Sequence, residues 1–352
     1  MRGMMEKREI VVVGGGPAGL ILAKFLAEEK RDFVLLEEHK KFFQKACGEC
    51  VSTTSRFGYS FPSLYESKKG IENIITKFRL FFPNKFEIGA EIDHEYWMLD
   101  KEKVEAEIAK QVRKKGGEIR MGQRVNRIRK ESDGIVVEPQ NIKCKLIVGC
   151  DGALSIVRKF FGMPDPMLGF AVEGKAKKKV DDHEIKFYFG KKYSSSGYAW
   201  KFPKKNEYNI GTGALTAEEV RERMEFIKKE FGAKELRGAY LPASLPMRCV
   251  FNHGILVGDA ASQIDCLTGG GINISTACAK MASEAIIKTS KKHLDYTIAN
   301  LHEYEERVNQ LILPQLKKTR RIALLLYKVF EKNDYLLYLG AKYLGKYFLN
   351  KL

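Results

Sequence analysis

The chain of 352 residues is 44% hydrophobic and 30% charged, which is typical of a globular protein and excludes a disordered one. It carries 61 Lys and Arg against 44 Asp and Glu, a net charge of +17, which favours an anionic partner. No nucleic acid is expected as partner, because no DNA- or RNA-binding motif accompanies the charge. The odd number of scattered cysteines, and the lack of a signal peptide or a long apolar run, predict a cytoplasmic protein, either free or peripheral at the inner face of the membrane.

The N-terminal residues predict a nucleotide-binding βαβ unit. Ile10–Val13 is expected to form a buried parallel strand, and Phe33–Leu36 the next one, which ends at Glu37. Between them a G-x-G-x-x-G loop opens a helix, whose free N–H groups and dipole favour a pyrophosphate. A carboxylate at Glu37 can accept hydrogen bonds from ribose hydroxyls. The loop residues predicted to contact the nucleotide are Gly14, Gly16, Pro17, Ala18 and Gly19.

Further elements of the same kind follow along the chain. Lys101–Lys115 is predicted to be a helix, and Leu146–Gly149 and Ile255–Gly258 are predicted to be buried strands. These two strands lead into the short acidic turns Asp151-Gly152 and Asp259-Ala260. Strands that alternate with helices indicate a parallel sheet covered on both faces. The expected fold class is therefore α/β, with a Rossmann-like nucleotide domain.

Two segments interrupt this alternation. Ile75–Trp97 and Leu168–Leu215 are rich in aromatic and β-branched residues and are predicted to form a second, antiparallel sheet. From Leu294 the pattern is helical. The nucleotide domain is therefore expected to be discontinuous. The predicted domains are residues 1–60, 98–165 and 246–290 for the cofactor, 61–97 and 166–245 for the substrate, and 291–352 for a C-terminal helical region.

Two later motifs identify the nucleotide. Residues 147–158, with Asp151-Gly152, resemble the "DG" motif of the flavoprotein hydroxylase superfamily, and residues 256–261, with Asp259, resemble its "GD" motif. The resemblance implies FAD as the cofactor. It also implies that Asp259 binds the ribityl or ribose chain, a role that suits a carboxylate at a strand end. The alternative is that both acids only cap helices.

Leu267–Asn273 opens another predicted helix after a glycine run, and Cys266 stands where the family usually has proline. In the superfamily this helix end meets the pyrimidine edge of the flavin, where its dipole stabilises the negative charge of the reduced ring. The resemblance thus adds a further set of predicted cofactor contacts. In addition to Glu37, they are Glu38, Lys45, Ala46, Cys47, Gly48, Lys101, Val125, Asp151, Gly152, Asp259, Gly269, Gly270, Gly271 and Ile272.

A narrower resemblance is to the geranylgeranyl reductases. Lys45–Glu49 is similar to that family's Lys-x-Cys-Gly-[Gly/Glu] segment, and Gly197–Lys204 to its Tyr-x-Trp-x-Phe-Pro strand. The resemblance implies an enzyme that saturates C=C bonds of the isoprenoid chains of archaeal-type lipids with hydride from reduced FAD. Because the glycine loop serves FAD and no second nucleotide fold is visible, the electron donor stays open between NAD(P)H, ferredoxin and deazaflavin.

An aromatic strand is the predicted substrate wall. Side chains at alternate positions leave one face of a strand, so three large rings are expected to form an apolar surface that suits an isoprenoid chain. A neighbouring strand offers two more. An ordinary aromatic sheet core is the alternative. The predicted substrate-binding residues are Tyr198, Trp200, Phe202, Phe187 and Phe189.

Cys47 is the candidate catalytic residue, at the substrate end of the flavin that the resemblance implies. A thiol there could donate a proton, gate the substrate or support redox cycling, and a bound water is the alternative proton source. With Cys50 it forms a C-x-x-C pair, a spacing that permits a disulfide. A close-packed structural cysteine is the alternative. No metal is expected, because no second Cys or His pair has zinc-ligand spacing. Lys101 stands where the family often has an arginine beside the flavin. A lysine keeps the positive charge but lacks the planar guanidinium that can form two parallel hydrogen bonds.

The C-terminal residues 317–352 carry nine Lys and Arg against two acids, interleaved with Leu and Tyr. A basic helix with an apolar face suits an anionic membrane interface, and a helical lid on the main body is the alternative.

Three rival functions share the motifs above. They are an FAD-dependent aromatic monooxygenase, a halogenase, whose family strand is Trp-x-Trp-x-Ile-Pro, and a non-catalytic lipid-binding flavoprotein.

Overall fold

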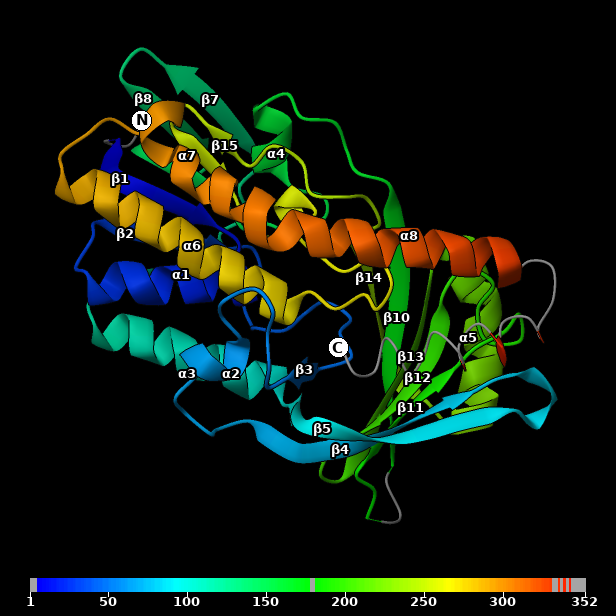
Figure 1. The fold of residues 1–352 in the computed structure, drawn as a ribbon. Helices are drawn as coiled ribbons and strands as arrows, with labels where there is room; N and C mark the ends of the chain where they lie inside the picture. Colours follow the sequence, from blue (N-terminus) through cyan, green and yellow to red (C-terminus); the bar gives the residue numbers. More distant parts are fainter. Residues whose placement is uncertain (1–4, 178–180, 331–334, 336–337, 340–341, 343–352) are drawn as a thin grey trace.

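The computed structural model describes residues 5–177, 181–330, 335, 338–339 and 342. Two eight-stranded sheets make up most of the fold and lie side by side in Figure 1. α1, α3 and α6 pack beside the first sheet, while α5 packs on the second. α8 (Leu313–Phe330) runs from the first sheet towards the second. The predicted α/β class is therefore confirmed.

The first sheet holds the predicted βαβ unit. Its main order is β15-β16-β9-β1-β2-β6, and β1 pairs in parallel with both β2 and β9. Ile10–Val13 is almost fully buried, since helices cover the sheet. The strands are β1 (Glu6–Val13), β2 (Phe33–Glu37), β6 (Glu118–Met121), β7 (Arg127–Glu131), β8 (Gly134–Glu138), β9 (Ile142–Gly149), β15 (Val250–Phe251) and β16 (Gly254–Leu256).

The second sheet has the order β14-β10-β13-β12-β11-β4-β5-β3. All its pairs are antiparallel except β11 with β4, so the sheet departs from the purely antiparallel one predicted. This parallel pair joins two segments that are distant in sequence. The strands are β3 (Cys50–Ser52), β4 (Ile71–Phe81), β5 (Glu87–Leu99), β10 (Leu168–Lys177), β11 (Glu184–Tyr188), β12 (Tyr198–Pro203), β13 (Glu207–Ala214) and β14 (Lys234–Pro242).

The helices begin where the sequence offers a capping residue or a glycine turn. Pro17 occupies the first turn of α1, where its missing N–H costs no hydrogen bond. Asp100 caps α3 by accepting a bond from the backbone of Lys103. The remaining helices are α1 (Pro17–Glu28), α2 (Phe61–Leu64), α3 (Lys101–Lys114), α4 (Ile156–Phe160), α5 (Ala217–Phe231), α6 (Ile272–Lys291) and α7 (Ile298–Arg307), with short 3₁₀ turns at Pro83–Lys85 and Gly258–Ala261 and a π segment at Val308–Ile312.

Three details differ from the sequence-based expectation. The strand predicted over Ile255–Gly258 ends at Leu256, because Gly258 turns the chain at a positive φ of 70°. β3 pairs with β5, so part of residues 1–60 belongs to the second sheet. The β7–β8 hairpin was not predicted, because its strands are short and β7 is highly charged.

The predicted C-terminal helices are present as far as Phe330. Most of the tyrosine-rich part of that prediction, at residues 331–334, 336–337, 340–341 and 343–352, lies outside the described residues. Within the described part of the chain, no helix is both long enough and apolar enough to span a bilayer.

Candidate functional site

The glycine loop follows β1 at the carboxyl edge of the parallel sheet, where doubly wound folds bind their ligands. Gly14 has a φ of 102°, which favours glycine, and a side chain there would collide with the carbonyl of Cys150. A Cβ on Gly19 would overlap the carbonyl oxygen of Gly14. Strand and helix are therefore in backbone contact, and neither glycine tolerates a side chain.

The start of α1 is open in the way that a pyrophosphate requires. Its N-cap, Gly16, makes no side-chain cap, the first turn has no acid, and no atom lies within 4 Å of a Cβ built on Gly16. Free N–H groups at a helix N-terminus bind phosphate. Glu37 braces the loop from β2, because its Oε2 accepts from the backbone of Gly15 at 2.7 Å and its Oε1 from His39. These residues fit the FAD pyrophosphate.

The two acidic turns behave differently. The carboxylate of Asp151 already accepts hydrogen bonds at the start of α4, from Ser155 at 2.6 Å and from the backbone of Ile156 at 2.8 Å. Among the described residues, the carboxylate of Asp259 accepts no hydrogen bond. Burial raises the pKa of Asp259, while Lys45 and Lys101 oppose the rise. Asp259 is thus the acid with capacity left for a ligand's hydroxyl groups.

The second glycine run brings another open helix end beside Asp259. Gly271 is the N-cap of α6 and makes no side-chain cap, and a Cβ on it would lie 3.6 Å from Oδ1 of Asp259. Gly269 turns the loop at a φ of 65°. The hydroxyl of Tyr198 donates to the carbonyl oxygen of Thr268 in this loop. The second sheet therefore contacts the cofactor side directly.

The five aromatic residues predicted as a wall lie together, three on β12, Phe187 on β11 and Phe189 just after it. Neighbouring rings along β12 are 6.1 Å apart for Tyr198 and Trp200 and 6.2 Å apart for Trp200 and Phe202. Phe187 makes edge contacts with Tyr198 at 5.3 Å and with Phe202 at 5.2 Å, and Phe189 lies 5.9 Å from Tyr198. Trp200 and Phe202 are buried and the other three rings are half-buried. The wall is both part of the sheet core and an apolar surface.

The loop that carries Cys47 lies against this wall. A Cβ on Gly48 would lie 3.0 Å from the ring of Phe202 and 3.8 Å from Nε1 of Trp200. At the other end of the loop, Nζ of Lys45 packs over Gly152, at the turn that follows β9. The loop is therefore placed between the cofactor turns and the aromatic wall.

Cys47 and Cys50 are both free thiols. Although Cys47 is only half-buried by exposure, desolvation raises the pKa of its thiol, and Lys101 opposes the rise. Burial raises the pKa of Cys50 to about 12. Both are thus thiols and not thiolates at neutral pH. Among the described residues no group of His, Cys, Asp and Glu is arranged to hold a metal ion.

A buried polar cluster lies behind the loop, and the sequence motifs did not identify it as part of the site. Glu49 is 2% exposed and its Oε2 accepts from Lys204 at 2.8 Å. Glu173, which is fully buried, pairs with Arg237 at 2.8 Å. Asn209 lies between the two carboxylates, 3.2 Å from one and 3.3 Å from the other. Buried charges of this kind require such pairing, because desolvation is costly.

Lys101 extends this cluster towards Cys47. Its Nζ lies 3.4 Å from Oε1 of Glu105, and its backbone N–H donates to Glu49 at 2.9 Å. Its ammonium also stands 4.8 Å from the ring centroid of Phe43. Burial lowers the pKa of Lys101, but Cys47, Glu105 and Glu49 outweigh it, so the net shift is upward. Lys101 therefore remains a cation beside the thiol.

Two glycines of β13 lie against the aromatic wall, and the sequence motifs did not identify them. Gly211 and Gly213 of β13 pair with Trp200 and Tyr198, and a Cβ on Gly211 would overlap the indole. Their signal was the glycine alternation in a strand, which marks close approach of another group. Glu38 is an exposed acid near Arg124, which lies 3.6 Å away.

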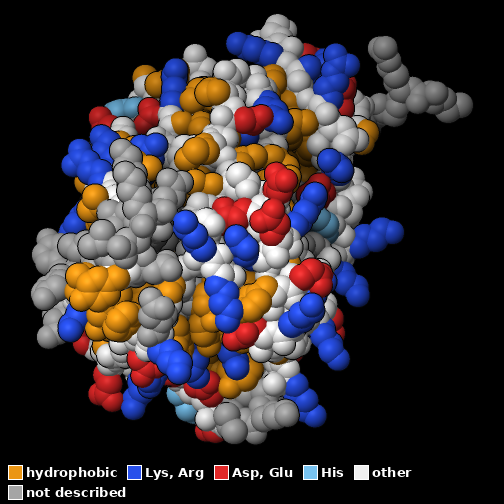
Figure 2. All heavy atoms as spheres, turned by 90° about the vertical axis from the view of Figure 1, so that its right-hand side faces the viewer, with side chains coloured by type: hydrophobic (Ala, Val, Ile, Leu, Met, Phe, Trp, Pro, Cys, Tyr) orange, Lys and Arg blue, Asp and Glu red, His pale blue; other side chains and the backbone are white. Residues whose placement is uncertain are grey.

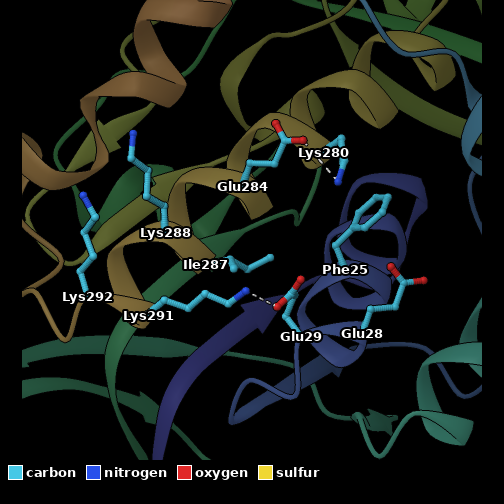
Figure 3. Close-up of a pocket in the computed structure, with 9 residues that line it drawn as sticks. All are labelled: Phe25, Glu28, Glu29, Lys280, Glu284, Ile287, Lys288, Lys291 and Lys292. Atoms are coloured by element: carbon cyan, nitrogen blue, oxygen red, sulfur yellow. Dashed lines mark ion pairs between the residues drawn. The ribbon is translucent and has the colours of Figure 1, made fainter.

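Val125 is buried in the core of the first sheet. A surface groove lies between α1 and α6 (Figure 3). In it Lys280 lies 3.8 Å from the ring centroid of Phe25, and Lys291 pairs with Glu29 at 2.6 Å. None of the predicted site residues lines this groove.

Two family models match the chain. Residues 7–176 match the FAD binding domain, and residues 171–240 match the geranylgeranyl reductase catalytic domain. The second match contains the aromatic wall and also Glu173, Asn209 and Arg237. Together the two matches span about two thirds of the chain and cover the glycine loop, the Cys47 loop and the second sheet.

Named relatives agree with these matches. The chain is 27% identical over 345 residues to digeranylgeranylglycerophospholipid reductase of Methanocaldococcus jannaschii, covering 87% of this chain and 83% of the relative. It is 28% identical over 308 residues to digeranylgeranylglycerophospholipid reductase 2 of Methanothermobacter thermautotrophicus, covering 79% and 77%.

Solved structures share the fold. A geranylgeranyl bacteriochlorophyll reductase-like protein of Thermoplasma acidophilum has a TM-score of 0.80 at 19% identity, covering 97% of this chain and all of that one. The FAD complex of the halogenase PltM has a TM-score of 0.72 at 13% identity, covering 98% and 82%. FAD is the cofactor that the domain match and the fold imply. By these matches the chain is similar to the geranylgeranyl reductases among the FAD-dependent flavoproteins.

Proposed function

We propose that this protein is an FAD-dependent reductase that saturates C=C bonds in the geranylgeranyl chains of membrane lipids. The observation that carries the proposal is the place of the Cys47 loop. Gly48 contacts Phe202 and Trp200 of the aromatic wall, while Lys45 of the same loop contacts Gly152 beside the cofactor turns. An apolar chain bound at the half-buried rings of the wall would thus lie beside the loop that carries the thiol and reaches the cofactor turns.

The residues of the chain have separable tasks in this reaction. Bound FAD in its reduced form supplies the hydride. The aromatic wall orients an unreactive alkene and excludes water, which is where the protein contributes most to such a reaction. Cys47 donates the proton to the second alkene carbon, which its protonated state allows. Asp259 and the open ends of α1 and α6 hold the cofactor.

A single-turnover experiment tests the proposal. The FAD of the purified protein is reduced with dithionite under anaerobic conditions, and a digeranylgeranyl lipid is added. The proposal predicts that the flavin reoxidises with the lipid and without oxygen. Reoxidation only on admission of oxygen favours a monooxygenase or a halogenase on the same fold. A flavin that no donor reduces favours a lipid-binding flavoprotein. NAD(P)H, ferredoxin and deazaflavin can be compared as physiological donors in the same assay.

We also propose that α8 meets an anionic membrane surface, which would bring the site to its lipid substrate. α8 holds five Lys and Arg and no acid. Lys317 and Arg321 are exposed one turn apart, and Leu324 and Leu325 are 44% and 55% exposed on the next turns. Figure 2, viewed from the side on which α8 ends, shows hydrophobic patches interspersed with Lys and Arg and with acidic side chains. Basic and apolar residues together suit the lipid interface.

Vesicle binding tests the membrane contact. Arg321→Glu is expected to weaken cosedimentation with phosphatidylserine-containing vesicles at least about fivefold, because each basic residue contributes on the order of 1 kcal/mol. Lys292→Glu makes the same change of charge at an exposed position after α6 and is the matched control. Equal binding by both variants and the parent protein would contradict the membrane role of α8.

A further inference from the structure

We propose that Asn209 is a positioning residue that holds Cys47 at a fixed position relative to Trp200 of the aromatic wall. The meaning of this role for catalysis rests on the proposed reductase function, whereas the contacts themselves do not. Asn209 lies on β13, is 1% exposed and belongs to none of the motifs that marked the cofactor or the wall. Its side chain links the backbone of Cys47 to Trp200 of the second sheet.

The contacts of Asn209 fix the orientation of its amide. Its Oδ1 accepts a hydrogen bond from Nε1 of Trp200 at 2.7 Å. An indole N–H can only donate, so the oxygen of the amide must face Trp200 and the NH₂ group must face the other way. There Nδ2 donates to the carbonyl oxygen of Cys47 at 2.8 Å. One planar amide therefore spans from the wall to the cysteine.

The surrounding charges specify this residue type. Nδ2 also lies 3.2 Å from Oε2 of Glu49 and 3.3 Å from Oε2 of Glu173, both buried carboxylates. Each carboxylate already has a cation of its own, Lys204 for Glu49 and Arg237 for Glu173. An aspartate at 209 would place a further carboxylate against both Glu49 and Glu173. An apolar residue would leave Cys47 and Trp200 without this bond, and unpaired buried groups cost about 1–3 kcal/mol each.

The loop that carries Cys47 needs an external restraint. Phe43 and Glu49, on either side of Cys47, are non-glycine residues with positive φ values of 53° and 55°. Such conformations persist only where the surroundings impose them. Glu105 and Arg237 hold the backbone of Phe43 at 2.9 Å and 3.0 Å. Between these anchors, Asn209 holds Cys47 itself by donating to its carbonyl oxygen.

Asn209 contacts the carbonyl oxygen of Cys47 and not its sulfur. Asn209 therefore affects the reaction through the position of the thiol relative to the isoprenoid chain bound on the wall. Loss of Asn209 is expected to misplace the proton donor while the FAD site, which is built from the glycine loops, keeps its cofactor. A misplacement of about 1 Å can lower a rate about a hundredfold.

Asn209→Leu, which is nearly the same size, tests this role in the FAD-loaded protein. The matched control is Asn73→Leu. Asn73 is a buried asparagine of the same sheet, 8% exposed, whose Nδ2 donates to the carbonyl oxygens of Asp182 and Pro203. Three quantities are measured for each variant: kcat for a digeranylgeranyl lipid, FAD content, and the rate at which iodoacetamide alkylates Cys47, located by mass spectrometry.

Asn209→Leu is expected to lower kcat at least tenfold with full FAD content, and to change the alkylation rate of Cys47 at least threefold. Asn73→Leu is expected to change neither, even where both variants lose similar thermal stability. Alkylation and kcat that follow only the loss of stability in both variants would overturn the proposal. Should Asn209→Leu not fold, Asn209→Ser is measured in its place with the same criteria.

The alkylation measurement separates this proposal from the proposed function. If the parent protein reduces no isoprenoid but Asn209→Leu alters Cys47 alkylation and Asn73→Leu does not, the reductase function fails and the positioning role stands. If the parent protein is active and Asn209→Leu keeps both its kcat and its Cys47 alkylation rate, the positioning role fails alone.

Discussion

Phe187 and Tyr188 are adjacent in sequence, yet their rings lie on opposite faces of β11. Phe187 packs against Tyr198 and Phe202 of the aromatic wall. Tyr188 stacks on Phe81 at 4.8 Å, on the face that α5 covers. The alternation of side chains along a strand thus gives two half-buried aromatic residues, one on the wall and one away from it.

This pair provides a test of the wall. Phe187→Ala is expected to raise KM for a geranylgeranyl lipid about fivefold, because it removes on the order of 1 kcal/mol of apolar contact. Tyr188→Ala also removes a half-buried ring, and it is expected to lower the thermal stability while KM stays unchanged. Steady-state kinetics of both variants decide the point. An equal rise in KM in both would mean that the wall does not hold the substrate.

The glycine loop yields a second matched pair. Gly19→Ala is expected to lower the stability of the apoprotein by about 1–3 kcal/mol, because its methyl group would overlap the carbonyl of Gly14. Gly16→Ala has open space and a φ of −77°, so the apoprotein is expected to stay as stable as the parent. Its FAD affinity is nevertheless expected to fall about tenfold or more, because the methyl group occupies the approach of the pyrophosphate.

Thermal unfolding without FAD and titration with FAD measure these two effects. Unchanged FAD affinity in Gly16→Ala would contradict the placement of the pyrophosphate at the start of α1. Loss of apoprotein stability in that variant would contradict the open space around Gly16.

Cys47→Ala tests the proton donor. General acids contribute about a hundredfold or more to a rate, so kcat for alkene reduction is expected to fall by that factor while FAD content is retained. Cys50→Ala is the control, since Cys50 lies three residues away on β3 and is likewise a free thiol. A Cys47→Ala enzyme that reduces the lipid as fast as the parent would remove Cys47 from the mechanism.

The stability of the protein should carry a pH signature of Glu173. Burial raises the pKa of Glu173 from 4.5 to about 7. The positive charge of Arg237 lowers this pKa, the negative charge of Glu49 raises it, and Lys204 lowers it. Between these two values the folded protein holds a proton that the unfolded chain releases, so the contribution of Glu173 to stability falls as the pH rises. Glu173→Gln lacks this titration. Relative to the variant, the parent is therefore expected to lose up to about 3 kcal/mol from about pH 4.5 to about pH 7.

Denaturant unfolding of both proteins across this interval measures the difference. A constant gap between parent and Glu173→Gln, or one that grows in favour of the parent with rising pH, would contradict a raised pKa for Glu173.

The sequence was sufficient where function is encoded in contiguous residues. The loop from Gly14 to Gly19 and the strand of Tyr198, Trp200 and Phe202 have local patterns, and their elements were placed correctly. Local patterns also located the helix after Gly271. These features follow from backbone and alternation rules that operate over a few residues.

The polar cluster behind Cys47 could not be inferred in this way. Glu49 and Lys204 are 155 residues apart in sequence, and Asn209 meets Glu173 only because β13 pairs with β10. The parallel pairing of β4 with β11 was missed for the same reason, since it depends on how distant segments come together. A charged residue in a sequence gives no sign of whether its partner will bury it.

Mass spectrometry of a digeranylgeranyl lipid, incubated anaerobically with the FAD-loaded protein and a reductant, tests the central claim most directly. We expect products heavier by two hydrogens for each double bond lost, in the absence of oxygen and halide, and about a hundredfold slower formation by Cys47→Ala. A lipid of unchanged mass while the flavin cycles, or one that gains an oxygen atom only in air, would contradict it.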